Sequence, residues 1–440
     1  MFNIQFINLK EMLSVKCSKL YSLQPMGIGT FSCESLTSYI SRLAKEHHLL
    51  TGVLINKILA PNMNKEYLIK SGENGGNRFY DGAKSMNGYC KSALDFSRLL
   101  ESLTLQKNLK GLTLISWKEI FSLRGLLKKS LSWCPSCISN WDVTGSQIYY
   151  PLSWYISSMK ICLIHNTYLL SRCPHCSKNP PILHRSSING YCPLCKGWLG
   201  NPQLILPFSN IKQEVCNGKN IEELLTLDTT NLKKVSQSLQ KLIEEVSDGN
   251  VAEFARLMSI PKVTMWDWVK GERLPSLEGL LRICSQLEIS IKKLLTNGKA
   301  MFDYAQGKPR EKILPQSTIT ISKRRKINPE LLQKKLEGYI ESDKTFSLSE
   351  ISKRIGYDRK LLYQHCPEQC KKIVESYKRY CEKQSLERKE MVASRVQAAA
   401  EELMRNNIYP SRRSVEKCLG KSAVLREKYI QQVWKETIHN

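Results

Sequence analysis

Four short pairs of metal-ligand residues decide the fold of this chain: Cys134-Pro-Ser-Cys137, Cys162-Leu-Ile-His165, Cys173-Pro-His-Cys176 and Cys192-Pro-Leu-Cys195. Structural zinc is bound tetrahedrally by four ligands, and a gap of two residues lets one tight turn present two of them. Eight ligands are therefore enough for two closed sites. The third and fourth pairs are separated by 15 residues, the spacing of a zinc ribbon, and the first and second by 24.

We expect the pairs to be used sequentially, so that the first two share one ion and the last two share another. A cross-braced arrangement, in which the first and third pairs share one ion, is the alternative. In both cases the protein fills every ligand position, which leaves no place for an activated water and disfavours hydrolytic zinc chemistry. The expected cofactor is therefore Zn²⁺, as two structural ions.

The charge of the chain indicates a polyanionic partner. Its 440 residues include 66 Lys and Arg against 40 Asp and Glu, a formal net charge of +26. Nucleic acid is the usual partner of such a surplus, and we expect double-stranded DNA. No apolar run approaches the roughly 18 residues that a membrane span needs, so no membrane partner is expected. The N-terminus shows no signal peptide, and nine cysteines are scattered outside the pairs, which fits a reducing cytoplasm.

We predict a mainly α, multidomain fold with a double zinc-binding, zinc-ribbon-like module and several helix-turn-helix domains. Leu36, Tyr39, Ile40 and Leu43 lie at helical spacing and predict one buried stripe. Further helices are expected over 92–102 and 117–129. The expected domains are an N-terminal helical domain (1–130), the zinc module (131–200), a helical domain (201–298), a basic linker (299–327), and two helix-turn-helix repeats (328–390 and 391–440).

Residues 250–283 have the pattern of a helix-turn-helix. Asn250 caps a first amphipathic helix, Pro261 suits the start of a second, and Gly271 stands where a left-handed cap residue is wanted. We expect a shared core of Phe254, Leu257, Met265 and Trp268. A recognition helix presents its early residues to base edges in the major groove. The exposed Trp266 is unusual for that role and can instead mark a protein contact.

Residues 328–440 contain an internal repeat with an offset of 64 residues. Apolar positions recur in register, and Gly356 matches Gly420 between two helical patterns. Each copy therefore predicts a small three-helix unit, with 358–365 as the candidate recognition helix of the first. Residues 311–440 hold 28 Lys and Arg against 17 Asp and Glu, a net charge of +11. Two packed helical units with solvated basic faces are the alternative interpretation.

The candidate DNA-contacting residues are exposed polar or basic positions in these patterns, together with the basic linker. They are Lys262, Val263, Thr264, Trp266, Asp267, Lys270, Arg273, Arg324, Arg325, Arg359, Lys360, Tyr363, Gln364, Arg412, Arg413, Lys421, Ser422 and Arg426. We expect no enzyme activity, because the chain has no phosphate-binding loop of the Gly-x-x-x-x-Gly-Lys-Ser/Thr type and no clustered carboxylates of a two-metal nuclease.

The sequence resembles the TniQ/TnsD family of transposon target selectors. The resemblance lies in Pro25 and in Glu34-Ser-Leu-Thr-Ser-Tyr-Ile-Ser-Arg-Leu-Ala44, followed by the four metal-ligand pairs with Trp154, Leu169 and Leu199. Residues 355–370 are similar to C-terminal segments of TnsD-like members. Tyr39 stands where the family often has Trp, which exchanges one large aromatic residue for another.

The resemblance implies a non-catalytic adaptor in the bacterial cytoplasm, associated with the nucleoid. Such proteins mark an insertion site and recruit the AAA+ ATPase regulator of transposition. TnsD-like members bind an attachment site on DNA themselves, whereas shorter TniQ members couple a CRISPR effector complex to the transposition machinery. The basic repeats favour the first branch. A DNA-binding transcription repressor is a further alternative, but it leaves the zinc module without a role.

Overall fold

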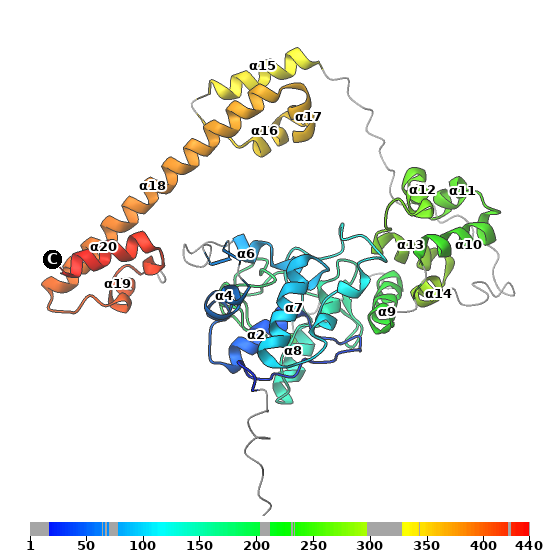
Figure 1. Cartoon of the computed structure of the whole chain (residues 1–440), viewed down its shortest axis with the longest axis horizontal. Helices are drawn as coiled ribbons and strands as arrows, with labels where there is room; N and C mark the ends of the chain where they lie inside the picture. The colour runs from blue at the N-terminus through cyan, green and yellow to red at the C-terminus, as the bar shows by residue number, and fades with distance from the viewer. Residues whose placement is uncertain are drawn as a thin grey trace, which may run out of the picture. The chain divides into compact units, whose positions relative to one another are not determined.

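The computed structural model of the chain describes residues 17–63, 65–66, 68–69, 78–202, 212–229, 232, 234–296, 328–342, 344–420 and 424–439. These residues divide into two compact units, one covering the described part of 17–296 and the other 328–439 (Figure 1). The described residues are mainly helical, as predicted. None of the described helices is both long enough and apolar enough to cross a membrane.

The N-terminal part of the first unit is built from short helices around α2. Its elements are α2 (Leu36–Glu46), α3 (Thr51–Val53), η1 (Leu54–Leu59, a π-helix), α4 (Ala60–Asn62), α6 (Arg78–Asp81), η2 (Ala83–Asn87), α7 (Lys91–Thr104), η3 (Leu109–Leu112) and η4 (Ile115–Trp117). The predicted helices at 35–44 and 92–102 are confirmed by α2 and α7. Ser35 caps α2 by accepting a hydrogen bond from the Ser38 backbone N–H.

The prediction of a helix over 117–129 is wrong, because this segment forms turns. Gly125 adopts φ +70°, a left-handed conformation that ends a helix. The backbone N–H of Ser122 donates to the Pro275 carbonyl, and that of Lys128 donates to the Tyr155 carbonyl. Trp117, Ile120, Phe121 and Leu126 of this segment are nevertheless buried, in a core formed with other parts of the chain.

The metal-ligand segment has little regular structure. Its elements are α8 (Pro135–Val143), η5 (Leu152–Tyr155), β1 (Ile161–Cys162) and β2 (Thr167–Tyr168). The two strands pair antiparallel, with Cys162 opposite Thr167. This segment is not separate from the N-terminal helices, since the backbone N–H of Ser35 donates to the Tyr150 carbonyl and the Thr51 hydroxyl donates to the Ser187 carbonyl. Contacts therefore cross the domain boundary that we expected at 130.

Among the described residues, six further helices belong to the first unit: α9 (Lys212–Thr226), α10 (Val235–Ser247), α11 (Val251–Leu257), α12 (Lys262–Lys270), α13 (Leu277–Leu287) and α14 (Ile291–Thr296). They share one hydrophobic core with residues between 114 and 159. The boundary expected at 200 is therefore also crossed by the core.

Helices α11 and α12 form as the capping residues predict. The Asn250 side chain accepts hydrogen bonds from the first turn of α11, and Gly271 ends α12 at φ +74°. Phe254, Met265 and Trp268 are buried, as expected. The assignment of Leu257 to this core is wrong. Leu257 is 49% exposed, and Met258, which is 3% exposed, is buried instead.

The second unit consists of α15 (Pro329–Ile340), α16 (Leu348–Ile355), α17 (Arg359–His365), α18 (Pro367–Arg405), α19 (Arg412–Cys418), η7 (Val424–Arg426) and α20 (Lys428–His439). The boundary expected between 390 and 391 falls inside α18, a continuous helix of 39 residues. In the second copy a 3-10 turn occupies 424–426, with Leu425 outside helical geometry.

Candidate metal centres

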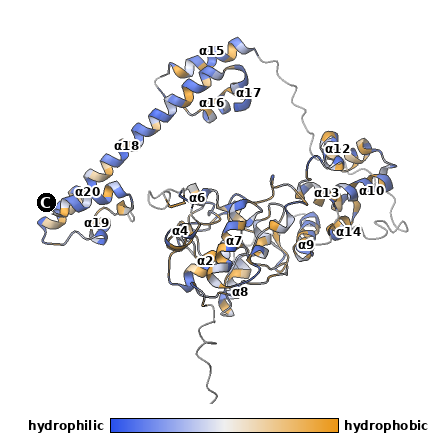
Figure 2. Cartoon of the chain, in the orientation of Figure 1, coloured by the Kyte–Doolittle hydropathy of each residue, from blue (hydrophilic) through white to orange (hydrophobic). Residues whose placement is uncertain are grey.

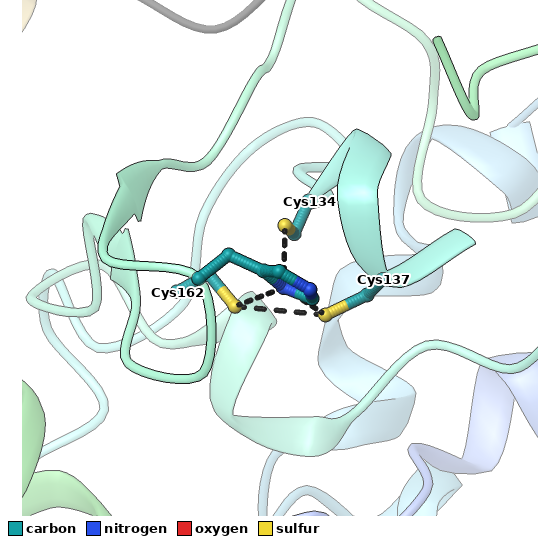
Figure 3. Close-up of side chains that lie close together, drawn as sticks. Cys134, Cys137 and Cys162 are labelled. Atoms are coloured by element: carbon teal, nitrogen blue, oxygen red, sulfur yellow. Dashed lines mark hydrogen bonds between the residues drawn. The ribbon is translucent and has the colours of Figure 1, made fainter. Parts of the chain in front are cut away.

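The first ligand cluster joins a helix start to a β-hairpin. Cys134 is the residue before α8, and Cys137 lies in the first turn of that helix. Cys162 ends β1, and His165 lies in the turn that leads to β2. Pro135 suits the first helical position, because proline has no backbone N–H to leave unpaired there. The four ligand atoms of Cys134, Cys137, Cys162 and His165 all lie within 4.8 Å of one another (Figure 3).

The distances in this cluster fit a tetrahedral zinc ion. The Sγ atoms of Cys137 and Cys162 are 3.6 Å apart. The Nδ1 atom of His165 lies 3.6, 3.2 and 3.7 Å from the Sγ atoms of Cys134, Cys137 and Cys162. Zinc–ligand bonds of about 2.3 Å to sulfur and about 2.0 Å to nitrogen require edges of about 3.8 Å between sulfurs and about 3.6 Å from sulfur to nitrogen. The cluster can therefore hold Zn²⁺ with little adjustment.

Asn140 holds the imidazole of His165 from its far side. The side-chain amide of Asn140 lies 3.0 Å from His165 Nε2. The atom at this distance is the amide nitrogen, Nδ2. Ligation by Nδ1 puts the ring proton on Nε2, so the amide of Asn140 would turn to let its oxygen accept from that proton. Asn140 lies one turn after Cys137 in α8, so one helix supplies both a ligand and the group that orients another.

The second cluster is formed by two turns with the same backbone pattern. The N–H of Ser177 donates to the Cys173 carbonyl, and the N–H of Lys196 donates to the Cys192 carbonyl. Ser177 and Lys196 both have left-handed φ values, +54° and +62°. Each turn therefore reverses the chain directly after its second cysteine. Both pairs use the same turn, and this turn has two residues between its cysteines.

The second cluster also has tetrahedral dimensions. Cys173 and Cys195 Sγ atoms are 3.7 Å apart, and those of Cys176 and Cys192 are 3.9 Å apart. The backbone N–H of Gly197 lowers the pKa of Cys195 to about 7, which favours the thiolate form that binds metal. The sequential pairing of ligands is confirmed, and the cross-braced alternative is wrong. His175 lies outside both clusters, with its Nε2 atom 2.8 Å from the Trp198 carbonyl.

Aromatic side chains pack around the clusters. Trp133 is fully buried, and its Nε1–H donates to the Leu199 carbonyl at 3.1 Å. Trp141 stacks on Tyr149 with ring centroids 4.8 Å apart. Gly190 has φ +91°, and a Cβ atom there would lie 2.8 Å from the Trp198 ring. These rings form the small core that the metal clusters tie together.

The first cluster also contacts the following helices. Leu163, between two ligands, lies against Gly218 of α9, where an added Cβ would approach its side chain to 3.2 Å. Lys160, just before β1, forms a 2.7 Å ion pair with Glu214 of α9. Folding of the first metal centre is therefore coupled to the position of α9.

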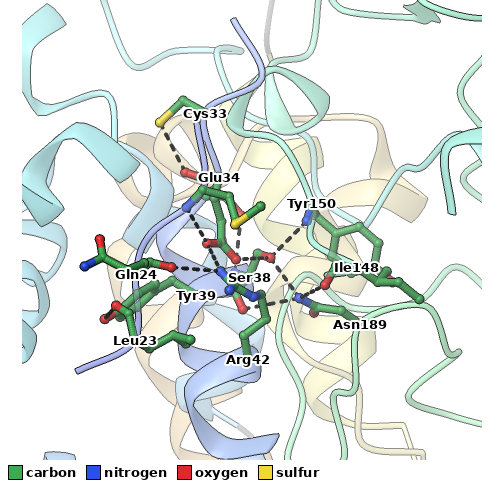
Figure 4. A network of polar contacts seen from close by, with 12 residues as sticks. Leu23, Gln24, Cys33, Glu34, Ser38, Tyr39, Arg42, Ile148, Tyr150 and Asn189 are labelled. Carbon is green, nitrogen blue, oxygen red and sulfur yellow. Dashed lines mark hydrogen bonds and ion pairs between the residues drawn. The ribbon is translucent and has the colours of Figure 1, made fainter. Parts of the chain in front are cut away.

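A buried polar network that the sequence did not predict fixes α2 to the metal-ligand segment (Figure 4). Glu34 forms an ion pair with Arg42 and accepts a hydrogen bond from Ser38 Oγ at 2.8 Å. Ser38 Oγ in turn accepts from the Tyr150 backbone N–H and from Asn189 Nδ2, both at 2.9 Å. The network thus connects one turn of α2 to two distant segments of the chain.

Glu34 is buried, so its carboxylate needs the charge of Arg42 beside it. Glu34 and Arg42 have 0% and 4% of their side-chain surface exposed. Burial raises the pKa of Glu34, and the adjacent Arg42 guanidinium opposes that shift by favouring the carboxylate. Removing either charge would leave the other uncompensated in a buried site.

The predicted DNA-contacting residues of α12 lie mainly on its exposed side. Lys262, Val263, Trp266 and Lys270 are exposed, and Thr264 and Asp267 are half-buried. Lys270 Nζ lies 5.7 Å from the centre of the Trp266 ring. Arg273 is exposed and pairs with Asp267 at 3.4 Å. The exposed side of α12 therefore combines the cations of Lys262 and Lys270 with the aromatic ring of Trp266.

In the second unit, Arg359, Lys360, Tyr363 and Gln364 are all exposed on α17. Arg412 and Arg413 begin α19, where Arg412 donates to the Leu425 carbonyl and lies over the Trp434 ring. Among the described residues, Arg412 is therefore held by contacts within the fold, whereas Arg413 is exposed. Arg426 belongs to the turn η7. The candidates outside the described residues are Arg324, Arg325, Lys421 and Ser422.

Comparison with known proteins assigns part of the chain. A search of curated proteins finds no match. Residues 25–169 match the model of the TniQ family. This range contains the Glu34–Arg42 ion pair and all four ligands of the first cluster, and it ends before Asn189 and the second cluster. Over this range the chain is similar to the TniQ family, a family associated with transposition.

Proposed function

We propose that this chain is a non-catalytic target selector of a transposon, which binds an attachment site on double-stranded DNA and recruits the AAA+ regulator of transposition. The observation that carries the proposal is the combination of a TniQ match over 25–169 with basic helical units beyond it. The two metal centres would be structural zinc sites, since all ligand positions belong to the protein.

DNA binding is proposed for two places. In the first unit, α11 and α12 would act as a helix-turn-helix, with α12 as the recognition helix. In the second unit, α17 would present Arg359 and Lys360 to the duplex. The net charge of +11 over 311–440 supports this assignment, because contacts to phosphates supply most sequence-independent affinity.

The test is the salt dependence of binding to a labelled 40-bp duplex of random sequence, measured by fluorescence anisotropy. Each lost phosphate contact lowers the slope of log affinity against log salt by about 0.9. The double variant Arg359→Ala/Lys360→Ala should therefore lower the slope by up to about 1.8. Lys107→Ala/Lys110→Ala removes the same charge from exposed positions in the TniQ-matching region and should leave the slope unchanged.

A failure of the full chain to bind duplex DNA would contradict the proposal, as would equal slopes for the two double variants. The second candidate function is the TniQ adaptor of a CRISPR effector, which the match over 25–169 equally permits. In that role the chain would bind the effector complex and show no strong affinity for duplex DNA alone.

A further inference from the structure

The second unit has two small cores that share one helix. The first core contains Leu332, Leu336, Leu348, Ile351, Leu362, Cys366, Cys370 and Ile373. The second contains Ala393, Val396, Ala399, Ala400, Val415, Leu425 and Ile430. Positions 64 residues apart occupy both cores, as in the pairs Leu332 and Val396, Ile351 and Val415, and Cys366 and Ile430. Helix α18 is thus the last helix of the first core, after α15, α16 and α17, and the first helix of the second (Figure 1).

The middle of α18 has no core of its own. Between Ile373 and Ala393 none of its residues is buried, and most are exposed. This stretch is mostly hydrophilic (Figure 2). Ion pairs one turn apart join Lys378 to Glu382 and Lys383 to Glu387, each at 3.9 Å. The helix crosses this solvated stretch unbroken.

The length of this stretch matches a feature of duplex DNA. Cys370 belongs to the first core and Val396 to the second, 26 residues further along the same helix. At about 1.5 Å per residue the two positions are about 39 Å apart along the axis. One turn of B-DNA is about 34–36 Å, and half-sites are commonly spaced by this distance.

We propose that α18 is a rigid spacer that holds the helices around the two cores about one duplex turn apart, so that together they bind a bipartite DNA site of fixed spacing. The inference rests on the proposed DNA-binding function. Exposed cations occur at both ends of the spacer, in Arg359 and Lys360 of α17 and in Arg413 of α19. A flexible tether would give no such spacing, because its two units could reach many separations.

The test is selection of bound duplexes from a library with 40 random base pairs, using the full chain. The two enriched sequence blocks should have one centre-to-centre spacing, of about 11 base pairs for a rise of about 3.4 Å each. One tandem duplication of Ser376–Leu386 lengthens α18 by about 16 Å and turns it by about 20° beyond whole turns. This displacement is about half a duplex turn, so the two-block motif should be lost.

A second duplication of the same segment lengthens α18 by about 33 Å in total, close to a full duplex turn. The two-block motif should then return, with a spacing increased by about 10 base pairs. In a matched pair, Gln384→Gly/Ser385→Gly should broaden the spacing and lower affinity on the order of tenfold, whereas Gln384→Ala/Ser385→Ala should change neither. Circular dichroism checks that the variants remain helical.

Each outcome decides one point. Enrichment of DNA with a variable spacing, or with a spacing that the double duplication leaves unchanged, would overturn the rigid spacer while the proposed DNA-binding function stands. Enrichment of no sequence by the full chain would overturn both. A return of the motif at the longer spacing supports both.

Discussion

Replacement of Cys137 by serine should abolish the first metal centre and unfold the segment around it. Cys137 is 3% exposed, and its Sγ atom lies 3.6 Å from that of Cys162 and 3.2 Å from His165 Nδ1. A hydroxyl is a much poorer zinc ligand than a thiolate. The structure offers no other His, Cys, Asp or Glu in this cluster to replace it among the described residues.

The expected loss is large compared with the stability of a domain. A structural zinc site contributes on the order of 10 kcal/mol to folding, whereas a whole domain is stable by about 5–15 kcal/mol. The contacts of Leu163 with Gly218 and of Lys160 with Glu214 extend the damage to α9. Loss of this site should therefore lower the unfolding temperature of the first unit, while the second cluster keeps its four ligands.

The assay is zinc content by elemental analysis together with thermal unfolding. The two clusters predict two ions per chain, and Cys137→Ser should retain one. Cys284→Ala is the matched control, because Cys284 is equally buried but lies outside both clusters. That control should keep two ions and lose about 1–3 kcal/mol. Two ions in Cys137→Ser, or one ion with unchanged unfolding, would refute the reasoning.

Three further predictions concern the stability of the fold. Gly279→Ala should lower the free energy of unfolding by about 1–3 kcal/mol, because the added Cβ would lie 2.3 Å from the buried ring of Trp268. Gly338→Ala places its Cβ in open space in a helix and should raise the free energy of unfolding by up to about 1 kcal/mol. Equal effects of the two variants in thermal unfolding would argue against this packing. Arg42→Ala should cost about 3–5 kcal/mol in urea unfolding by leaving the Glu34 charge unpaired, and a loss below about 1 kcal/mol would contradict the buried pair. Burial lowers the pKa of Lys128 to about 7 in the folded chain. Between pH 7 and about 10 the unfolded chain therefore binds more protons than the folded chain, so the free energy of unfolding relative to that of Lys128→Met should rise with pH. A difference between the two proteins that does not change with pH would be inconsistent with a buried Lys128 amine.

The metal ligands could be predicted from sequence because their geometry is local. Each pair forms one turn, and the two cysteine turns of the second cluster have the same hydrogen bonds. The spacing between pairs favoured the sequential pairing that the two clusters have, with the cross-braced pairing as the alternative. Helix caps such as Asn250 and Gly271 were predictable for the same reason, since their contacts lie within a few residues.

The Glu34–Arg42 network could not be predicted because its burial depends on distant segments. Glu34, Ser38 and Arg42 are four residues apart, opposite the apolar stripe of α2, where a surface helix has its solvated face. The segments around Tyr150 and Asn189 cover that face and bury it. The only local sign of this network in the sequence was the spacing of Glu34 and Arg42, eight residues apart, with the Ser38 hydroxyl between them.

The helix expected over 117–129 failed for a similar reason. Four of its apolar residues, Trp117, Ile120, Phe121 and Leu126, are buried, but in a core shared with α9–α14 rather than against a helix of their own. The continuity of α18 did have a sequence signal. No glycine or proline occurs from Glu368 to Tyr409, so nothing in that stretch favours the end of a helix.

The most direct test of the proposed function is selection of genomic DNA fragments by the purified chain, with and without a CRISPR effector complex. Direct recognition predicts that the chain alone enriches one discrete locus, that the enrichment is lost from Arg359→Ala/Lys360→Ala, and that the effector adds nothing. Enrichment that appears only when the effector and its guide RNA are present would contradict direct recognition and assign the chain to the adaptor role.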